Sequence, residues 1–288
     1  RQWDCTAARA RMLAIPGSLN GAAGALGLDI RKDPRGKELM DRFSKPQRNG
    51  KRIYPHEDPT GFAEYIGYCK QDVEVERKLD KILPPLSEIE AEAFALDYRI
   101  NDRGLAVNMD LVDRAFDFVE SYSEELVKKA VAIAGCRPTQ REKTLEFLAK
   151  RGLALPNLQA PTVEQLAKDP KTPPDIVQLL DYRIELSRAG TKKLKAIRNT
   201  VSSDGRIRGG FLFSAASTRR WSSTGVQVHN LQKPEGETNP EVVFRLLMAD
   251  ATLLPDIFDR PLTALAQSVR GFFESPEHLL VADYASVE

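Results

Sequence analysis

The sequence predicts a mostly helical α+β protein, and three observations carry this prediction. Up to about residue 200, apolar residues recur at helical spacing in stretches that Pro and Gly separate. Beyond residue 200, short strand-like runs alternate with polar loops and further helices. With 42% hydrophobic and 29% charged residues, the chain has the composition of a globular protein and not of a disordered one. Its 288 residues are enough for one large domain or for two.

Residues 1–58 are expected to form three short helices joined by loops. The first is TAARARMLAIPG, which Pro16-Gly17 ends, and the second is the small Ala/Gly-rich SLNGAAGALGL. The third is RGKELMDRFSKP, which Pro46 ends. None of the three has the alternation of a strand.

A longer helix is predicted between residues 59 and 83. Asp58 is a good N-cap, Pro59 suits the first turn, and a double proline at 84–85 stops the helix. One apolar stripe, the pattern of a helix packed on a core, is formed by Phe62, Ile66, Cys69 and Val73. The double proline is the first expected domain boundary.

Helices continue after this boundary. Ser87 and Glu90 form a capping box that opens a helix through about residue 102, and Gly104 ends it. GLAVN predicts a short strand, and Asn108 or Asp110 then caps a long helix.

Gly135 closes that long helix, and three more helical stretches are expected in residues 141–198. They are separated by LPNLQAPT and DPKTPP, and the last one is PDIVQLLDYRIELSRAGTKKLKAI.

The pattern changes near residue 200. Asp204-Gly205 indicates a hairpin turn, and RIRGGFLFSAAS is expected to follow as a strand. The loop-rich TRRWSSTGVQVHNLQKP comes next, followed by helices around 240–268. A final strand, from Leu279 to Ala282, would present Asp283 at its end.

Composition excludes several classes of protein. No run of 18 apolar residues occurs, so no membrane span is expected. Cys5, Cys69 and Cys136 are too widely spaced for a zinc ribbon or a disulfide framework, which favours a reducing, cytoplasmic compartment. The start without Met and the end inside a strand indicate a piece of a longer protein.

Charge is spread unevenly along a chain whose net charge is only +1. Residues 181–220 hold ten Lys or Arg side chains but only three acids. Such a concentrated basic segment indicates a contact with a polyanion, although a solvated charged face explains it about equally well.

Two motifs and the chain end carry candidate chemistry. In YCKQD, Tyr68 and Asp72 stand four residues apart on one helix face, where they could offer one metal ligand and a hydroxyl that orients water. Taken alone, an amphipathic helix with a half-buried Tyr is the better explanation of this pair, because Y-x-x-x-D is common by chance. STRRWSSTGVQVHNLQKP concentrates Arg, Ser, Thr and amide side chains that suit a duplex backbone and minor groove, or a polar loop. Asp283 could bind a divalent cation or simply form a turn.

Taken in order, these segments resemble a family A DNA polymerase of the kind that bacteriophages and prophages encode. DYASVE resembles motif A of the family, usually D-Y-S-x-I-E, and YCKQD resembles the third motif of the linked 3′→5′ exonuclease. NDRGLAVN resembles the strand that follows the exonuclease domain. TRRWSSTGVQVHNLQ resembles the segment T-G-R-L-S-S…N-L-Q-N, with matching positions at Thr218, Arg220, Ser222, Ser223 and Asn230.

This resemblance implies three parts. Residues 1–84 would be the C-terminal part of an exonuclease domain, 85–200 a helical linker and thumb region, and 201–288 the first part of the palm, ending in motif A. The implied activity is template-directed DNA synthesis by two-metal nucleotidyl transfer to a primer 3′-hydroxyl, with a linked 3′→5′ exonuclease. The implied cofactor is Mg²⁺, and the implied partners are primer–template DNA and dNTP. A bacterial or phage-infected cytoplasm, without a membrane, would be the setting.

The resemblance also implies residue roles. Asp283 and the Tyr284 carbonyl would hold a metal ion in the palm, and Glu288 would reject a ribose 2′-hydroxyl. Asp72 and Tyr68 would serve the exonuclease. DNA or nucleotide contacts are implied for Thr218, Arg220, Ser222, Ser223, Gln227, His229, Asn230, Arg270, Lys192, Lys193 and Lys195.

The chain also departs from the family pattern. The second metal aspartate and the nucleotide-binding helix would lie beyond Glu288, and no D-x-E occurs before Tyr68. The expectation is therefore a catalytically silent piece that still binds primer–template duplex through residues 181–230. Three alternatives stay open: a non-catalytic nucleic-acid-binding helical protein, a stand-alone exonuclease with a helical appendage, and a helical interaction module.

Overall fold

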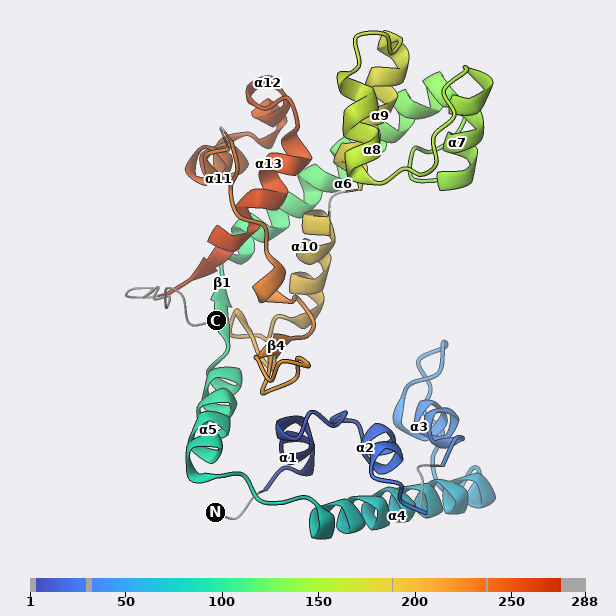
Figure 1. The fold of residues 1–288 in the computed structure, drawn as a ribbon, viewed down its shortest axis with the longest axis vertical. Coiled ribbons are helices and arrows are strands. Elements are labelled where there is room, and N and C mark those ends of the chain that lie inside the picture. Colours follow the sequence, from blue (N-terminus) through green and yellow to red (C-terminus); the bar gives the residue numbers. More distant parts are fainter. Residues whose placement is uncertain (1–3, 30–32, 188, 237, 276–288) are drawn as a thin grey trace. The chain divides into compact units, whose positions relative to one another are not determined.

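The computed structural model describes residues 4–29, 33–187, 189–236 and 238–275 (Figure 1). The chain divides into two compact units. Unit 1 is Arg1–Asn101 with Phe211–Ser222, and unit 2 is Asp102–Gly210 with Ser223–Glu288. Helices dominate both units, and short strands complete them, so the predicted mostly helical α+β class is confirmed. The division into exonuclease, thumb and palm parts stays a prediction.

Unit 1 contains five helices among its described residues. They are α1 (Thr6–Met12), α2 (Leu19–Ala25), α3 (Gly36–Ser44), α4 (Pro59–Ile82) and α5 (Glu88–Arg103). The three short helices pack along α4, α1 near its C-terminal end and α3 near its N-terminal end (Figure 1). Ala10, Ala22, Val75 and Leu79 lie in the small core between them.

The prediction that the apolar stripe of α4 packs on the core is wrong. Ile66 and Val73 are 43% and 54% exposed, and Cys69 is exposed as well. The helix instead buries the face that carries Tyr68, Val75 and Leu79. Both faces of this amphipathic helix carry apolar residues, so periodicity alone did not identify the one that α1–α3 cover.

The predicted caps of α4 and α5 are confirmed. The Asp58 carboxylate accepts a hydrogen bond from the Gly61 N–H at 3.0 Å at the start of α4. The Ser87 N–H donates to Glu90 Oε2 at 2.7 Å, and the Glu90 N–H donates to Ser87 Oγ at 3.3 Å. This reciprocal pair is the capping box expected at the start of α5.

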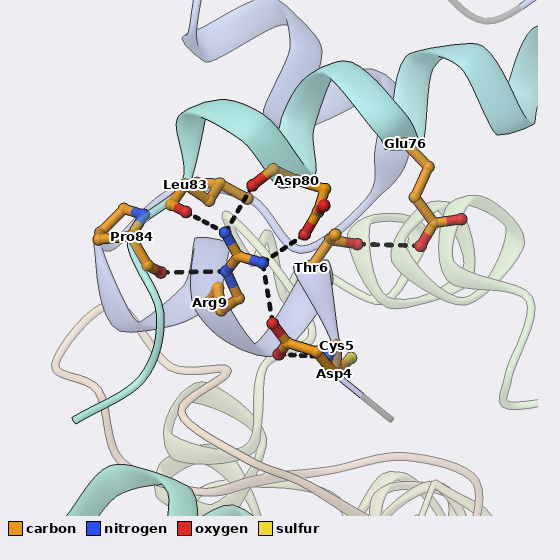
Figure 2. A network of polar contacts seen from close by, with 8 residues as sticks. All are labelled: Asp4, Cys5, Thr6, Arg9, Glu76, Asp80, Leu83 and Pro84. Atoms are coloured by element: carbon orange, nitrogen blue, oxygen red, sulfur yellow. Dashed lines mark hydrogen bonds and ion pairs between the residues drawn. The ribbon is translucent and has the colours of Figure 1, made fainter. Parts of the chain in front are cut away.

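A buried arginine completes the C-terminal end of α4 (Figure 2). The Arg9 guanidinium donates to the carbonyls of Asp80 at 2.7 Å, Leu83 and Pro84 at 3.0 Å. It also pairs with the carboxylates of Asp4 at 2.9 Å and Asp80 at 2.6 Å. The last carbonyls of a helix have no partner within the helix, so Arg9 of α1 satisfies the carbonyl of Asp80 and those of the two residues that follow α4.

Unit 2 is built around the long helix α6 (Met109–Ala134). The Asn108 carboxamide accepts from the Leu111 N–H at 3.0 Å, which makes Asn108 and not Asp110 the cap. Gly135 ends the helix with φ 67°, as predicted. Other helices of the unit are α7 (Arg141–Lys150), α8 (Ala160–Lys168), α9 (Pro174–Leu186), α10 (Ala189–Thr200), α11 (Pro240–Ala249), α12 (Leu254–Ile257) and α13 (Pro261–Ser268).

These helices form two clusters of buried residues. The larger cluster joins α6, α10, α11 and α13 through residues such as Leu194, Leu247 and Leu265. The smaller one joins α7, α8 and α9 through Leu148, Val163 and Leu180, near the C-terminal end of α6 (Figure 1). The predicted single helix over residues 174–197 is wrong, because the chain forms two helices, α9 and α10.

Short antiparallel strands complete the fold. The predicted strand β1 (Leu105–Val107) is confirmed and lies between β2 (Arg206–Ile207) and β5 (Phe273–Glu274). The expected turn at Asp204-Gly205 is confirmed, with Gly205 at φ 74° and a bridge between Val201 and Ile207. Single-turn 3₁₀ helices are η1 (Val228–Asn230), η2 (Ala251–Leu253) and η3 (Val269–Phe272).

The single strand predicted over residues 206–217 is wrong. Gly209 has φ 65°, so the chain turns after β2 and a separate strand β3 (Phe211–Leu212) begins. β3 pairs with β4 (Ser222–Ser223) in a two-stranded sheet. A left-handed glycine interrupts the extended backbone that one continuous strand would need.

Candidate nucleic-acid interface

Tyr68 and Asp72 lie one turn apart on α4, as the sequence predicts. Tyr68 is only 5% exposed, and its ring lies against Gly36 of α3, where an added Cβ would come within 2.2 Å of Tyr68 Cε2. Its hydroxyl donates to the Met40 sulfur at 3.8 Å, and its ring stacks on Tyr65. Tyr68 therefore contributes to the packing of α3 on α4, whatever further role it has.

The residues predicted to bind metal are not assembled within the described part of the chain. Asp283, Tyr284 and Glu288 lie outside the described residues. Among residues 4–29, 33–187, 189–236 and 238–275, no group of three His, Cys, Asp or Glu side chains could hold a metal ion. Asp72 thus has no set of companion ligands among these residues, and they do not by themselves fit a Mg²⁺ site.

The first predicted DNA-binding group lies on the hairpin formed by residues 211–222. The Arg219 N–H donates to the Ala216 carbonyl at 2.9 Å, and the Ala216 N–H donates to the Arg220 carbonyl at 3.2 Å. These two bonds close a tight turn whose residues 217–220 are all exposed. Thr218 lies within this turn, Arg220 at its end, and Ser222 in the returning strand.

Sequence reasoning missed the residues that hold this hairpin. The Trp221 indole N–H donates to Asp97 Oδ1 at 2.7 Å, and the Asn101 amide donates to Asp97 Oδ2 at 3.1 Å. Asn101 also accepts from the Phe211 N–H at 2.9 Å. Burial raises the pKa of the Asp97 carboxyl, although the bonds from Trp221 and Asn101 oppose that shift. The sequence signal that could have identified them is that the polar residues Asp97 and Asn101 occupy the apolar face of α5.

The second predicted group lies in unit 2, on residues 226–231. Lys193 Nζ donates to the Val226 carbonyl at 2.6 Å and lies 3.4 Å from Gln227 Oε1. Burial lowers the pKa of the Lys193 ammonium. Two predicted residues, Lys193 and Gln227, are thus brought into contact, and the lysine holds the backbone of the segment that precedes η1.

The remaining predicted residues of unit 2 surround this segment. His229 and Asn230 belong to η1 and are exposed, and Ser223 lies in β4. Arg270 donates to the Leu231 carbonyl at 2.8 Å, so it supports the chain just after η1.

Several positive charges of residues 181–220 are already used within unit 2. Arg183 donates to the carbonyls of Pro138 and Leu158, and Arg198 pairs with Asp113 at 3.0 Å.

The same holds beside the turn at Asp204-Gly205. Arg206 donates to the Arg103 carbonyl at 2.8 Å. Arg208 pairs with Asp204 at 2.7 Å, and this bond holds the pKa of the Asp204 carboxyl at about 2. The exposed basic side chains of the window include Lys192, Lys195, Arg219 and Arg220. A count of charges from sequence therefore overstates what a polyanion could meet.

Backbone strain gathers in the same stretch. Four non-glycine residues among those described have positive φ, and three of them are Ser214 (49°), Arg219 (63°) and Gln227 (54°). L-residues adopt this region at a cost of roughly 1–2 kcal/mol, and such residues cluster at ligand-binding sites. Arg219 and Gln227 lie next to or within the segment that holds the predicted DNA-binding residues, so the strain falls close to these residues.

The chain is similar in sequence to a curated phage protein. It is 32% identical over 299 residues to a DNA polymerase of Bacillus phage SP02. This alignment covers 100% of the chain and 46% of the phage protein, so the chain spans about half the length of that relative. No protein-family model matches the chain.

Among solved structures, the POL domain of Pol1 from M. smegmatis in complex with DNA primer-template and dNTP aligns with a TM-score of 0.44. That alignment has 17% sequence identity and covers 80% of this chain and 39% of the other.

In the described part of the chain, none of the helices combines the length and the apolar character that crossing a membrane requires.

The sequence match to the phage protein includes the 211–222 hairpin, α4, α10 and the 226–231 segment, because it covers the whole chain. The chain is thus related, along its whole length, to a phage DNA polymerase.

Proposed function

We propose that the chain is part of a family A DNA polymerase that carries out template-directed DNA synthesis and has a linked 3′→5′ exonuclease. The observation that carries this proposal is the 32% identity to a phage DNA polymerase over the whole chain. The reaction would transfer a nucleotide from dNTP to a primer 3′-hydroxyl, in the cytoplasm of a bacterial or phage-infected cell.

The proposed cofactor is Mg²⁺. Two bound ions would lower the pKa of the primer 3′-hydroxyl and stabilise the charge on the displaced pyrophosphate. Asp283 and the Tyr284 carbonyl are the proposed ligands in the palm, and Asp72 is the proposed ligand in the exonuclease. Glu288 would exclude a ribose 2′-hydroxyl.

Contact with primer–template DNA is proposed for two groups of residues. In unit 1 they lie on the 211–222 hairpin, where the exposed turn presents Arg220. In unit 2, Lys192 and Lys195 are exposed on α10, and His229 and Asn230 are exposed on η1. Lys193 and Arg270 donate to backbone carbonyls of the 226–231 segment, so their proposed contribution is to support that segment.

Binding of duplex DNA across a range of salt concentrations tests this interface. Each phosphate neutralised by Lys or Arg contributes about −0.9 to the slope of log K against log salt. Three contacts, from Lys192, Lys195 and Arg220, predict a slope of about −2.7 and a loss of affinity of roughly 40-fold between 50 and 200 mM salt. An affinity that does not change with salt would contradict the proposal.

A matched pair of variants separates a specific interface from general charge. Lys192→Ala with Lys195→Ala should reduce the slope by about 2. Lys168→Ala with Lys171→Ala removes the same charge from exposed positions around the end of α8 and should leave the slope nearly unchanged. Equal effects of the two pairs would indicate attraction to net charge alone.

The alternative function is a non-catalytic nucleic-acid-binding helical protein that uses residues 181–230. The exposed basic side chains of this region would support it equally well. Substituting Asp283→Ala in the complete gene product that carries this chain distinguishes the two. DNA synthesis should be abolished if Asp283 holds catalytic metal, whereas the alternative predicts that every activity of that gene product is unchanged.

A further inference from the structure

The 211–222 hairpin presents two arginines on a short, closed turn. Residues 217–220 are exposed, and Arg219 is fixed in the left-handed region at φ 63°. Bonds between the backbones of Ala216, Arg219 and Arg220 leave the turn little freedom. Arg219 is the residue that departs from the glycine of the T-G-R-L-S-S segment, so the turn carries one more positive charge than that segment.

A buried polar cluster on α5 holds the base of this hairpin. The Trp221 N–H donates to Asp97 at 2.7 Å, and Asn101 bonds both Asp97 and the Phe211 backbone. The Phe213 ring lies edge-on to Trp221, with ring centroids 5.6 Å apart. All of these residues belong to unit 1, so α5 and the hairpin form one compact arrangement.

Burying the charged form of the Asp97 carboxylate costs free energy. The residue is 6% exposed, and burial raises its pKa. A buried charge of this kind contributes little net stability, but it fixes the direction of the groups that bond to it. Asp97 accepts from one indole and one amide, and these set the orientation of Trp221, which directly follows Arg220.

We propose that Arg219 is a contact for a DNA backbone phosphate and that Asp97 and Trp221 are the residues that position the turn for it. This inference rests on the proposed DNA-binding function. A turn fixed before binding loses less conformational entropy when it meets the duplex. The buried bond between Trp221 and Asp97 would therefore increase the affinity for DNA. Arginine suits the role because its guanidinium binds phosphate bidentately.

Charge alone predicts the opposite effect for Asp97. Removing a negative charge beside a basic turn should strengthen binding to a polyanion. If Asp97 positions the turn, its removal should weaken binding. The sign of the change therefore separates the two explanations.

The experiment measures binding of a primer–template duplex to the 288-residue chain and its variants at low and moderate salt. We expect Arg219→Ala to weaken binding about 3- to 10-fold and to reduce the salt slope by about 0.9, as one lost phosphate contact requires. We expect Asp97→Ala and Trp221→Phe each to weaken binding several-fold, and the double variant to be no weaker than either single variant.

Two controls distinguish positioning from a loss of structure. Asp97→Asn keeps an acceptor for the Trp221 N–H and should restore most of the affinity. Glu92→Ala removes an exposed carboxylate from the same helix and should leave binding unchanged or slightly stronger. Thermal unfolding of each variant shows whether unit 1 is intact, and Arg219→Ala, at an exposed position, tests the contact independently of the anchor.

Each outcome decides one point. Unchanged affinity in Arg219→Ala, or stronger binding in Asp97→Ala to the same extent as in Glu92→Ala, would overturn this inference. Failure of the unmodified chain to bind the duplex at low salt would instead overturn the proposed function.

Discussion

At the scale of single residues, the region matched to the polymerase segment combines strain with exposure. Arg219 is the sharpest case, since its side chain is exposed and its backbone is left-handed. We expect Arg219→Gly to raise the free energy of unfolding by roughly 0.5–1 kcal/mol, because glycine adopts positive φ without a steric penalty. Arg219→Ala keeps the strain and should give no gain. Chemical denaturation of the two variants measures the difference, and equal stabilities would show that the turn is unstrained.

The buried carboxyl of Asp97 makes a second prediction at this scale. Because its folded-state pKa lies above the unfolded value, its protonated form is favoured by folding. The stability that this group contributes is fully present below the unfolded pKa and is lost as pH rises through the folded pKa. The free energy of unfolding should therefore fall with rising pH in the wild type relative to Asp97→Asn. Parallel pH profiles for the two proteins would contradict the prediction.

At the scale of elements, distant carboxylates and guanidiniums complete helix ends. Glu185 on α9 is 4% exposed and accepts from the backbone N–H groups of Leu262 at 2.7 Å and Thr263 at 3.2 Å. These are the first N–H groups of α13, and a carboxylate also favours the positive end of the helix dipole. Glu185 therefore caps a helix that begins more than 70 residues later in the sequence.

Replacing this cap should be costly. We expect Glu185→Gln to lower the free energy of unfolding by roughly 2–3 kcal/mol, because one acceptor oxygen and the charge are lost from a buried site. Glu142→Gln is the control, since Glu142 is an exposed acid in the first turn of α7 and should cost under about 0.5 kcal/mol. Urea denaturation followed by far-UV circular dichroism measures both values. Similar losses in the two variants would mean that Glu185 acts only through its charge.

At the scale of the whole molecule, the two units have separate cores and separate polar clusters. We expect Arg9→Lys to loosen α1 and α4, since one ammonium cannot replace a guanidinium that bonds three carbonyls and two carboxylates. Native-state hydrogen exchange should show that α1 and α4 lose protection in this variant. Protection in α6, α9 and α13 should be unchanged. Glu185→Gln should give the reverse pattern. Uniform loss of protection in either variant would show that the chain unfolds as one cooperative body.

The sequence by itself determined the features that depend on neighbours within about four residues. The cap at Asp58, the capping box at Ser87 and Glu90, and the glycine that ends α6 were all predicted correctly. Their bonds join residues that are close along the chain, so the pattern of residue types is enough to identify them. The mostly helical class followed from the same local signals.

Tertiary structure alone decided which faces are buried and which charges are already used. In the folded chain, α1–α3 cover the other face of α4, and the predicted helix at 174–197 is divided into two. Lys193 and Arg198 bond to groups within unit 2. The bond between Asp97 and Trp221 joins residues 124 positions apart, and that between Arg9 and Asp80 joins residues 71 apart. Contacts at such separations depend on how the whole chain packs, and no local pattern of residues specifies them.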